Sequence, residues 1–374
     1  MRAEIIEGLR DISALAEPWR RLEQRSLEPN AFVSPRFVLP VLNCLAPPAP
    51  PWAVAVWSDG GRDALVGLGV FHRCGPHGRF PLPHAQACGG VHAYLGGLLL
   101  DLDQAAPALG ALLDTAASRS AGLHLRDLAW DGATAELLRS TARARGLSWH
   151  EQGRYDRACL DLGSEGGTSR WRAHLPTTRL REAARLRRRL VARGRLGWRW
   201  LKGQEVGDAT LERFLELEHA GWKGREGTSL RADPAHEAFF LQMAQGFRRD
   251  GELFFTELLL DGQPIASSCN LRSGDRGFAF KVAFDPEHAR SGPGILNELG
   301  LLEALESDMD GLRHLDSGTQ AGSFIEGLWP DRVTLVTGTL ALRPVAEAAA
   351  RAATAWSRLR GRLQSATALT AMTA

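Results

Sequence analysis

The hydrophobic positions of this 374-residue chain follow two different periods, which predicts a mixture of strands and helices. Runs rich in β-branched and aromatic residues, bounded by Gly, Asp or Pro, predict strands at 52–57, 64–71, 122–130, 157–162, 197–203, 312–318 and 333–344. Apolar residues spaced three and four apart predict helices at 16–28, 105–118, 133–145, 178–193, 208–221 and 234–250.

The segment 251–286 indicates a series of antiparallel strands that leads into a helix. An Asp-Gly turn at 261–262 separates the first two alternating runs, and the third ends at Phe284. A Gly- and Pro-rich loop follows, and apolar residues then recur at helical spacing: Ile295, Leu296, Leu299, Leu302 and Leu305. We therefore expect Gly292 and Gly294 to lie at the N-terminus of a helix.

Strands and helices occur in a similar order in the two halves, which indicates two related domains. The Gly- and Ser-rich stretch 163–170 suits a linker. We expect an α+β fold with a mixed sheet, with domains at 1–162 and 171–343 and a C-terminal helix at 344–374. Trp356, Leu359 and Leu363 lie on one side of that helix, and we expect it to dock on its own protein rather than on a membrane or a partner.

Composition narrows the class of protein. The 45 basic and 43 acidic residues leave a formal net charge of +2, so no overall field favours nucleic acid. Five cysteines without a CxxC motif argue against a disulfide framework and for a reducing compartment. The sequence has no apolar run of about 18 residues and no signal-peptide pattern at its start, so we expect a cytoplasmic protein.

The Gly loop at 290–294 allows two interpretations. Gly and Pro are ordinary turn residues, and any connection between a strand and a helix can contain them. Alternatively, the unpaired N–H groups and partial positive charge of a helix start form an anion site, and a loop without side chains lets a phosphate approach the backbone.

Several ordered segments resemble a known family: 221–230 (GWKGREGTSL), 261–271 (DGQPIASSCNL), 285–294 (DPEHARSGPG), 315–318 (LDSG) and 328–332 (LWPDR). Arg290, Gly292 and Gly294 are similar, one residue shorter, to the signature with which GNAT acyltransferases bind acyl-CoA. Over roughly 170–343 the chain resembles the branch of CelD-type, cellulose-biosynthesis-associated acetyltransferases. That branch typically has tandem GNAT-like domains similar to the FemABX peptidyltransferases, and the first half here, without the Gly loop, resembles a degenerate copy.

The resemblance implies a donor site in the second half for acetyl-CoA or another acyl-CoA, with no metal. The backbone of 290–294 would hold the pyrophosphate, and a splayed strand beside it would offer an amide to the thioester carbonyl. The residues implied are Val282, Ala283 and Phe284 on the strand and Arg290, Ser291, Gly292, Gly294 and Ile295 at the loop and helix start.

Acyl transfer to an amine also needs a route for the amine proton. The candidates for this catalytic role are Glu257, Asp285, His314 and Asp316. Asp316 ends a predicted strand beside a possible cleft, but an Asp before Ser-Gly is also a common turn residue. His314 alternates with Asp316 on the same strand face, and a solitary His is also common as a structural residue.

The leaving thiolate needs a proton donor, and many members of this fold use a Tyr. Both tyrosines of this chain, Tyr94 and Tyr155, lie in the first half, so Ser317, Ser323 or a water has to be considered for this role.

The segment 221–230 resembles the loop that shapes the acceptor pocket in this branch. Trp222 could stack on a substrate and Lys223 could hold a carboxylate or phosphate, although a core Trp and a solvated Lys are equally compatible with the pattern. With Asp285 and Ser323 they form the expected substrate-binding set. Many relatives carry a Tyr-Lys pair before the later Trp, and the corresponding stretch here is SFIEGLWPDR, so the role of that pair is not transferred.

Eight arginines crowd the segment 179–195, and such density could bind RNA phosphates or form a solvated helix face, which we favour. They are Arg179, Arg181, Arg185, Arg187, Arg188, Arg189, Arg193 and Arg195. A second cluster could in principle bind zinc, but its spacing fits no standard site: Cys74, His77, His84, Cys88 and His92.

We therefore predict an acyl-CoA-dependent N- or O-acyltransferase that acts on an amine or hydroxyl of a small molecule or saccharide. DNA is not expected as a partner, RNA and membranes are not favoured, and the oligomeric state stays open. The alternatives are an aminoacyl-tRNA-dependent transferase of the FemABX kind, favoured by the arginines, and a catalytically silent acyl-CoA-binding protein, favoured by the absence of a Tyr from the second half.

Overall fold

The computed structural model describes residues 1–374 except 60–63, 77–79, 165 and 354–374. Its strands are β1 (Arg2–Glu7), β2 (Trp52–Trp57), β3 (Leu65–Cys74), β4 (His84–Ala87), β5 (Leu99–Leu100), β6 (Gly122–Ala129), β7 (Trp149–Asp161), β8 (Leu196–Lys202), β9 (Leu253–Leu260), β10 (Gln263–Ser273), β11 (Arg276–Phe284), β12 (His314–Asp316) and β13 (Asp331–Ala341).

The α-helices are α1 (Gly8–Ala14), α2 (Ala16–Glu23), α3 (Pro35–Cys44), α4 (Ala105–Arg119), α5 (Ala133–Ala144), α6 (Arg170–His174), α7 (Thr177–Val191), α8 (Asp208–Ala220), α9 (Trp222–Arg225), α10 (Pro234–Arg249) and α11 (Pro293–Ser307). Short 3₁₀ helices are η1 (Ala31–Val33), η2 (Gly90–His92), η3 (Gly203–Glu205), η4 (Leu230–Ala232), η5 (Pro286–Ser291) and η6 (Phe324–Gly327).

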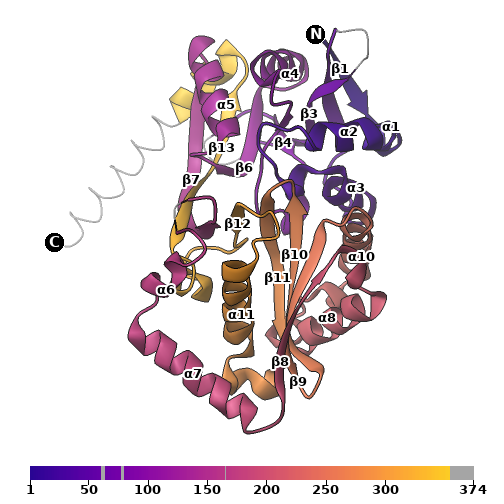
Figure 1. The fold of residues 1–374 in the computed structure, drawn as a ribbon. Coiled ribbons are helices and arrows are strands. Elements are labelled where there is room, and N and C mark those ends of the chain that lie inside the picture. The colour runs from indigo at the N-terminus through magenta and orange to yellow at the C-terminus, as the bar shows by residue number, and fades with distance from the viewer. Residues whose placement is uncertain (60–63, 77–79, 165, 354–374) are drawn as a thin grey trace, which may run out of the picture.

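One continuous mixed sheet connects the two halves of the chain (Figure 1). Its strands follow the order β1-β2-β3-β4-β6-β13-β7-β12-β11-β10-β9-β8, and β5 pairs with β3. The last strand, β13, lies between β6 and β7 of the first half, whereas β7 lies beside β12 of the second. Each half therefore contributes its closing strand to the part of the sheet where the halves meet.

Helices cover both faces of the sheet in each half. In the second half, α8 and α10 pack on one face, and α11 and α7 pack on the other. In the first half, α4 and α5 cover one face, and α1, α2 and α3 cover the other. Helix α3 also packs against α10. The two halves are thus joined through helix packing as well as through the sheet, as Figure 1 shows.

The expected α+β fold with a mixed sheet is confirmed, and most predicted elements are present. Helix α3 was missed because Pro35 and Pro40 interrupt its pattern, although Pro35 occupies the first turn, where proline is tolerated. Strand β7 begins at Trp149 rather than 157, since its polar first part is only half-buried and still pairs with β13.

The tail after β13 begins as a helix over 344–353, and Ala346 and Ala350 pack against Phe80. The predicted apolar side with Trp356, Leu359 and Leu363 lies outside the described residues. Among the helices that are described, none combines the length and apolar character needed to cross a membrane.

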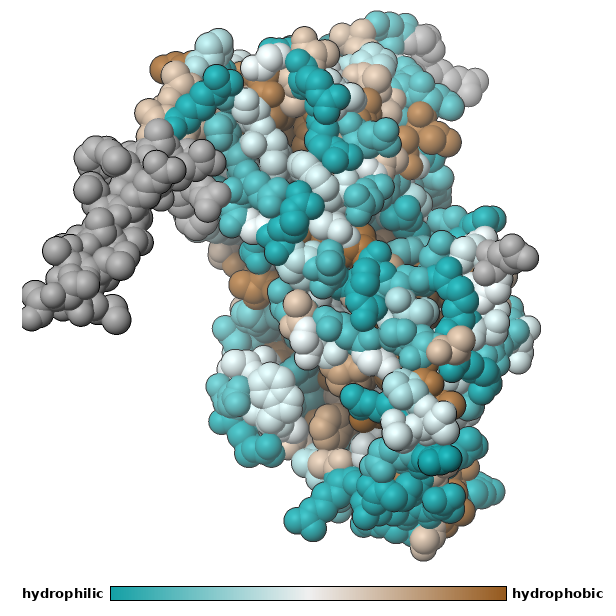
Figure 2. Space-filling view, turned by 90° about the vertical axis from the view of Figure 1, so that its left-hand side faces the viewer, coloured by the Kyte–Doolittle hydropathy of each residue, from teal (hydrophilic) through white to brown (hydrophobic). Residues whose placement is uncertain are grey.

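Hydrophilic side chains dominate the face shown in Figure 2, with hydrophobic ones recessed in its lower half. A groove of about 330 Å³ lies between α7, β8 and α11, and Leu180, Leu196 and Leu299 are among the residues that line it.

Candidate active site at the opening between β11 and β12

Strands β11 and β12 pair in parallel for only three residues. The last pair is Phe278 with Asp316, after which β12 ends and β11 continues to Phe284. Beyond Phe278 the edge of β11 has no further pairing with β12, although Gly318 lies close to the Ala279 carbonyl oxygen, and we call this unpaired edge the opening. An extended ligand can use such a free edge for main-chain hydrogen bonds.

A β-bulge lies in β11 at the start of this opening. Cys269 of β10 pairs with Lys281 and Asn270 pairs with Ala279, so Phe280 is an extra residue in β11. A bulge breaks the strict alternation of side chains and redirects those next to it. Phe280 belongs to the core beneath α8 and α10, and Lys281 points to the same side, as its contact with α8 shows.

The opening leads into the N-terminus of α11, as the Gly loop predicts. Gly292 is the N-cap residue with φ of 57° and provides no capping side chain, and Pro293 has no N–H group. The N–H of Leu296 donates to the Gly292 carbonyl oxygen. The N–H groups of Gly294 and Ile295 therefore lack a partner within the helix and are available to an anion.

The two glycines of this loop differ in the space around them. A Cβ on Gly292 would lie 2.9 Å from Leu186 Cδ1, so a side chain there would clash and strain the left-handed backbone. A Cβ on Gly294 would lie 3.7 Å from Phe284 Cδ1, an ordinary contact. The protein fold therefore requires glycine at 292 but tolerates a side chain at 294.

Basic groups surround the same helix terminus. The Arg189 guanidinium of α7 donates to the carbonyl oxygen of Arg290 at 3.4 Å, and both side chains are exposed. Asp285, predicted to bind substrate, accepts from the N–H of Glu287 and caps η5. The basic helix α7 thus lies against the predicted anion loop, a proximity that the sequence does not reveal.

A buried ionic cluster lies on the α8 side of the bulge. Glu218 accepts from the Leu230 N–H at 2.8 Å and forms ion pairs with Lys223 at 3.3 Å and Lys281 at 3.6 Å. Burial, reinforced by the nearby Lys281, lowers the pKa of Lys223. Trp222 is 51% exposed. Of the predicted acceptor pair, Lys223 therefore faces the bulge, while Trp222 lies at the surface.

Tyr94 comes from the first half of the chain but lies over the opening. Its ring centroid is 5.8 Å from that of Phe280, and a Cβ on Gly318, which has φ of 63°, would lie 3.1 Å from its Cδ2. Burial and the Glu218 carboxylate raise the pKa of Tyr94, so it keeps its proton at neutral pH. Tyr94 is a residue of the first half, and the fold brings its ring against Phe280 of the second half.

His92, on the same loop, contacts the second half directly. Its Nε2 lies 2.8 Å from Nδ1 of His236 in α10, and its ring stacks on Phe239 with centroids 5.1 Å apart. Burial, followed by the charge of Lys281, lowers the pKa of His92 to about 3, so the imidazole is neutral. This contact fixes the loop that presents Tyr94.

Arg157 of β7 is the fully buried cation behind the opening, with 0% side-chain exposure. Its guanidinium donates to the carbonyl oxygens of Thr319 at 2.8 Å and Tyr94 at 2.5 Å. It also donates to Asp316 Oδ1 at 3.3 Å and to the Tyr155 hydroxyl at 2.6 Å. One side chain therefore holds the loop that carries Tyr94 and the loop that follows β12.

The predicted base Asp316 lies at the opening, but its carboxylate is engaged. Oδ1 accepts from the Gly318 N–H at 2.7 Å and from Arg157, which is the arrangement of a turn residue. His314 pairs with Arg276 at the closed end of the two strands. Burial and the charge of Arg276 lower the pKa of His314.

The other predicted residues lie further from the opening. Glu257 is on β9, separated from β11 by β10, and its Oε2 accepts from Arg199 Nε at 2.7 Å. The Ser267 hydroxyl donates to its other oxygen at 3.4 Å. Ser323 caps η6 by accepting from the Ile325 N–H.

Helix α11 carries a buried carboxyl group, Glu298, that the sequence did not single out and that faces β10. Glu298 Oε1 accepts from the Ser268 hydroxyl at 3.1 Å, and Asn297 donates to Ser268 and to Thr256. Burial raises the pKa of Glu298 to about 7. Its spacing in the apolar helix pattern resembles that of a core position, which is why no sequence signal marks it.

In the described part of the chain, no group of three or more His, Cys, Asp and Glu side chains is arranged for a metal. Cys88 instead lies 3.5 Å from Nδ1 of His72, and His92 pairs with His236. His77 lies outside the described residues.

Solved structures with a similar fold include FemX, at 11% identity over 91% of this chain and 96% of that one, with a TM-score of 0.57. The C-terminal domain of a putative lysylphosphatidylglycerol synthetase from Agrobacterium fabrum has 12% identity, coverage of 91% and 96%, and a TM-score of 0.51. A conserved protein of unknown function from Bacteroides thetaiotaomicron has 10% identity, coverage of 88% and 97%, and a TM-score of 0.52.

These similarities concern the fold alone, and no curated protein matches the chain. The family model of the acetyltransferase (GNAT) domain matches residues 178–324, which include strands β8 to β11 with the bulge, the Gly loop and α11. This part of the chain therefore matches the family model of the acetyltransferase (GNAT) domain.

Proposed function

We propose that the protein is an acyl-CoA-dependent acyltransferase that binds its donor in the opening between β11 and β12. The observation that carries this proposal is the loss of pairing after Phe278 and Asp316, which leaves the edge of β11 free directly before the α11 N-terminus. The free edge suits the amide-rich pantetheine arm, and the N–H groups of Gly294 and Ile295 suit the pyrophosphate.

Donor binding brings the thioester to the bulge. In this proposal Arg189 and Arg290 add positive charge beside the pyrophosphate, and backbone amides between Val282 and Phe284 donate to the thioester carbonyl oxygen. The carbonyl is thereby polarised, and the negative charge that develops on its oxygen is stabilised.

Acceptor attack forms a bond from the amine or hydroxyl to the thioester carbon and breaks the carbon–sulfur bond. Glu218 forms an ion pair with Lys281 beside the bulge, and we assign to it the proton that leaves the acceptor. Tyr94, whose burial keeps it protonated, gives its proton to the departing thiolate. Burial and the Glu218 carboxylate raise the pKa of Tyr94, and in this proposal proton exchange with solvent restores both groups after transfer.

The acceptor would approach from the side of α8 and α9, where Lys223 and Lys281 converge on Glu218. Two ammonium groups favour an acceptor with a carboxylate or phosphate beside its amine or hydroxyl. The resemblance to the CelD-type branch supports a small molecule or saccharide in this place. In this proposal 171–343 is the catalytic domain, joined by 163–170 to an N-terminal domain at 1–162 that supplies Tyr94.

Replacing Gly294 by Val should weaken acyl-CoA binding at least about tenfold, because the side chain competes with the pyrophosphate for the helix N-terminus. The fold should survive, since the nearest atom to the new Cβ is 3.7 Å away. Isothermal titration calorimetry with acetyl-CoA and a longer acyl-CoA measures the affinity, and thermal unfolding checks the fold.

The matched control is Gly153→Val on β7, where a Cβ meets no atom within 4 Å. This variant should keep the donor affinity of the parent protein. Equal affinity of the Gly294→Val variant and the parent would exclude the Gly loop as the pyrophosphate site.

A second candidate function is transfer of an aminoacyl group from an aminoacyl-tRNA, which is the FemABX-like alternative that the sequence left open. It is favoured by the position of α7, because exposed Arg187, Arg188 and Arg189 lie on the helix that packs against the Gly loop. An RNA that reached this surface would approach the same opening.

We expect tRNA binding to be weak and indifferent to aminoacylation, because no aromatic side chain interrupts the arginines to stack bases. Filter binding of charged and uncharged tRNA across a salt series tests this, with the Arg187, Arg188 and Arg189 triple Ala variant alongside. Submicromolar binding selective for aminoacyl-tRNA, lost in that variant and falling by roughly 10³ or more between 50 and 200 mM salt, would support the second candidate instead.

A further inference from the structure

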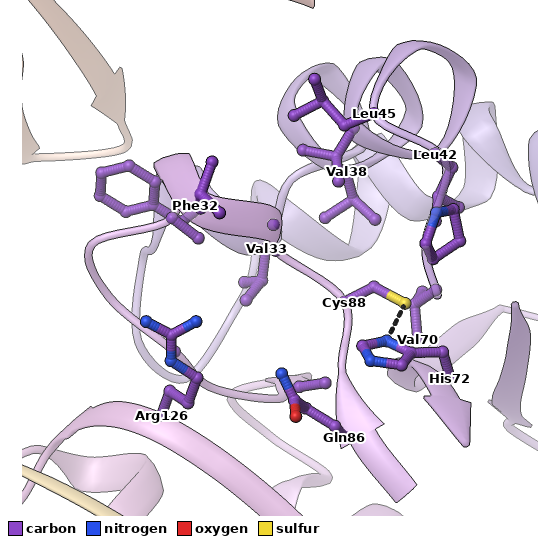
Figure 3. Close-up of a pocket in the computed structure, with 18 of the residues that line it drawn as sticks. Phe32, Val33, Val38, Leu42, Leu45, Val70, His72, Gln86, Cys88 and Arg126 are labelled. Atoms are coloured by element: carbon purple, nitrogen blue, oxygen red, sulfur yellow. Dashed lines mark hydrogen bonds between the residues drawn. The ribbon is translucent and has the colours of Figure 1, made fainter. Parts of the chain in front are cut away.

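The first half contains a cavity of its own, of about 310 Å³, between α3, β3, β4 and the segment 88–97 (Figure 3). Most of its wall is apolar, with Val38, Leu42 and Val70 among the contributors. Its volume is at the small end of the range for ligand pockets, about 300–1,000 Å³. The cavity is large enough for a small ligand, and among the described residues that line it His236 alone falls within the family match at 178–324.

The polar groups at the bottom of this cavity are neutral. Cys88 Sγ lies 3.5 Å from His72 Nδ1, as the dashed line in Figure 3 shows. Burial raises the pKa of Cys88 to about 12, and burial lowers the pKa of His72. Both side chains are therefore uncharged at neutral pH, and this end of the cavity suits an apolar group.

The opposite end carries a positive charge. Arg126 of β6 lines the cavity from an exposed position, and Figure 3 shows its guanidinium turned toward the same space as the Gln86 amide. Among the described residues that line the cavity there is no Asp or Glu. Arg126 and Gln86 together offer several N–H donors that an anionic head group could accept from.

The topology explains why a cavity forms here. Strand β4 pairs in parallel with β6 only at Ala85 with Leu123 and Gln86 with His124, and then ends. This repeats the short parallel pairing of β11 and β12 in the second half. The first half thus has a short parallel pairing of its own; the glycines beside it, Gly89 and Gly90, begin only the three-residue 3₁₀ helix η2 and no described α-helix, so a pyrophosphate site is not expected there.

We propose that this cavity is a second ligand site that binds a small amphiphile with an anionic head group. The aliphatic part lies between α3 and β3 and ends at Cys88 and His72, while a carboxylate or phosphate pairs with Arg126. The site is separate from the acyl-donor opening, and the proposal does not depend on the function assigned to that opening.

The segment 88–97 connects this cavity to the second half. Cys88, Ala93 and Leu95 line the cavity, whereas His92 and Tyr94 of the same segment contact Phe239 and Phe280. A ligand in the cavity therefore packs against the back of the segment that presents Tyr94. Occupancy should order this segment, which slows amide hydrogen exchange in the peptide that contains it.

Calorimetry on the full chain with decanoate, decyl phosphate and decanol, each below its critical micelle concentration, tests the proposal. We expect one molecule of decanoate or decyl phosphate per chain and at least about tenfold weaker binding of decanol, since the alcohol cannot pair with Arg126. The anion that binds with the higher affinity identifies the preferred head group, carboxylate or phosphate. Absence of binding by either anion, or equal binding of decanol, would overturn the proposal.

Two variants locate the ligand. Arg126→Met should lower the affinity for the anion about tenfold and leave that for decanol unchanged, while Arg143→Met on exposed α5 is the matched control without effect. Leu45→Trp fills the cavity from a half-buried position and should abolish binding of all three probes. If a folded Leu45→Trp variant bound the probes with unchanged affinity, the ligand would lie elsewhere and the proposal would be refuted. Acetyl-CoA affinity should be unchanged in each variant, so failure here is distinguishable from failure of the donor site.

Discussion

Replacing Tyr94 by Phe is expected to lower kcat by about 100-fold or more while leaving acyl-CoA affinity nearly unchanged. The hydroxyl is the only group removed, and the ring keeps its contacts with Phe280 and Phe32. Without it the thiolate must take its proton from solvent, so chemistry slows although the donor still binds. Steady-state release of CoA at saturating donor, beside calorimetric affinity for acetyl-CoA, separates the two quantities.

Tyr155→Phe is the matched control because it also removes one phenolic hydroxyl. That hydroxyl accepts a hydrogen bond from Arg157 and so supports the structure, and its loss should affect kcat much less. An unchanged kcat in the Tyr94→Phe variant would remove Tyr94 from the protonation step and leave a water in that role.

The glycine-rich start of α11 could be predicted from the sequence because its signal is local. A bare loop, Gly292 to Gly294, stands directly before an apolar helix pattern, and both glycines lie where that pattern places them. The role of a strand edge beside it came from the family resemblance, and β11 does lose its partner at Phe278. Signals of this kind can be recognised in the sequence because the residues that form the feature are neighbours in the chain.

Tyr94, to which the proposal assigns a proton transfer, and Arg157, which holds its loop, could not be predicted in the same way, because they come from distant segments. Tyr94 and Arg157 belong to the first half and reach the opening only because β7 lies beside β12 and the segment 88–97 crosses to β11. Lys281 was hidden for a different reason. The bulge at Phe280 shifts the alternation of β11, so a strict two-residue period assigns its side chain to the wrong face.

Among the carboxylates, residue type was easier to predict than position. Asp316 stands at the end of β12, where its Oδ1 accepts from Gly318 and Arg157, whereas Glu218, a residue within an ordinary helix pattern, pairs with two lysines beside the bulge. The sequence shows which residues are acidic, but their partners come from segments that are distant in the chain.

Arg157→Met is expected to lower the free energy of unfolding by about 3–5 kcal/mol, the usual cost of removing one partner of a buried ion pair. The guanidinium is fully buried and satisfies Asp316, two backbone carbonyl oxygens and the Tyr155 hydroxyl. Met fills a similar volume but donates nothing, so the buried Asp316 carboxylate keeps the Gly318 N–H but loses its ion-pair partner, and two carbonyl oxygens lose the guanidinium donor. Urea unfolding followed by circular dichroism measures the change.

Two further variants test the cause of that loss. Arg154 lies three residues earlier on β7, where it is exposed and pairs with Glu151. Its replacement by Met should lower the free energy of unfolding by less than about 1 kcal/mol. Adding Asp316→Asn to Arg157→Met should recover part of the lost stability, because the unpaired buried charge is then absent. If the stability losses of the two single variants simply added in the double variant, the ion pair would not be the source of the loss. The stability lost would then arise from the two loops that Arg157 holds through Tyr94 and Thr319.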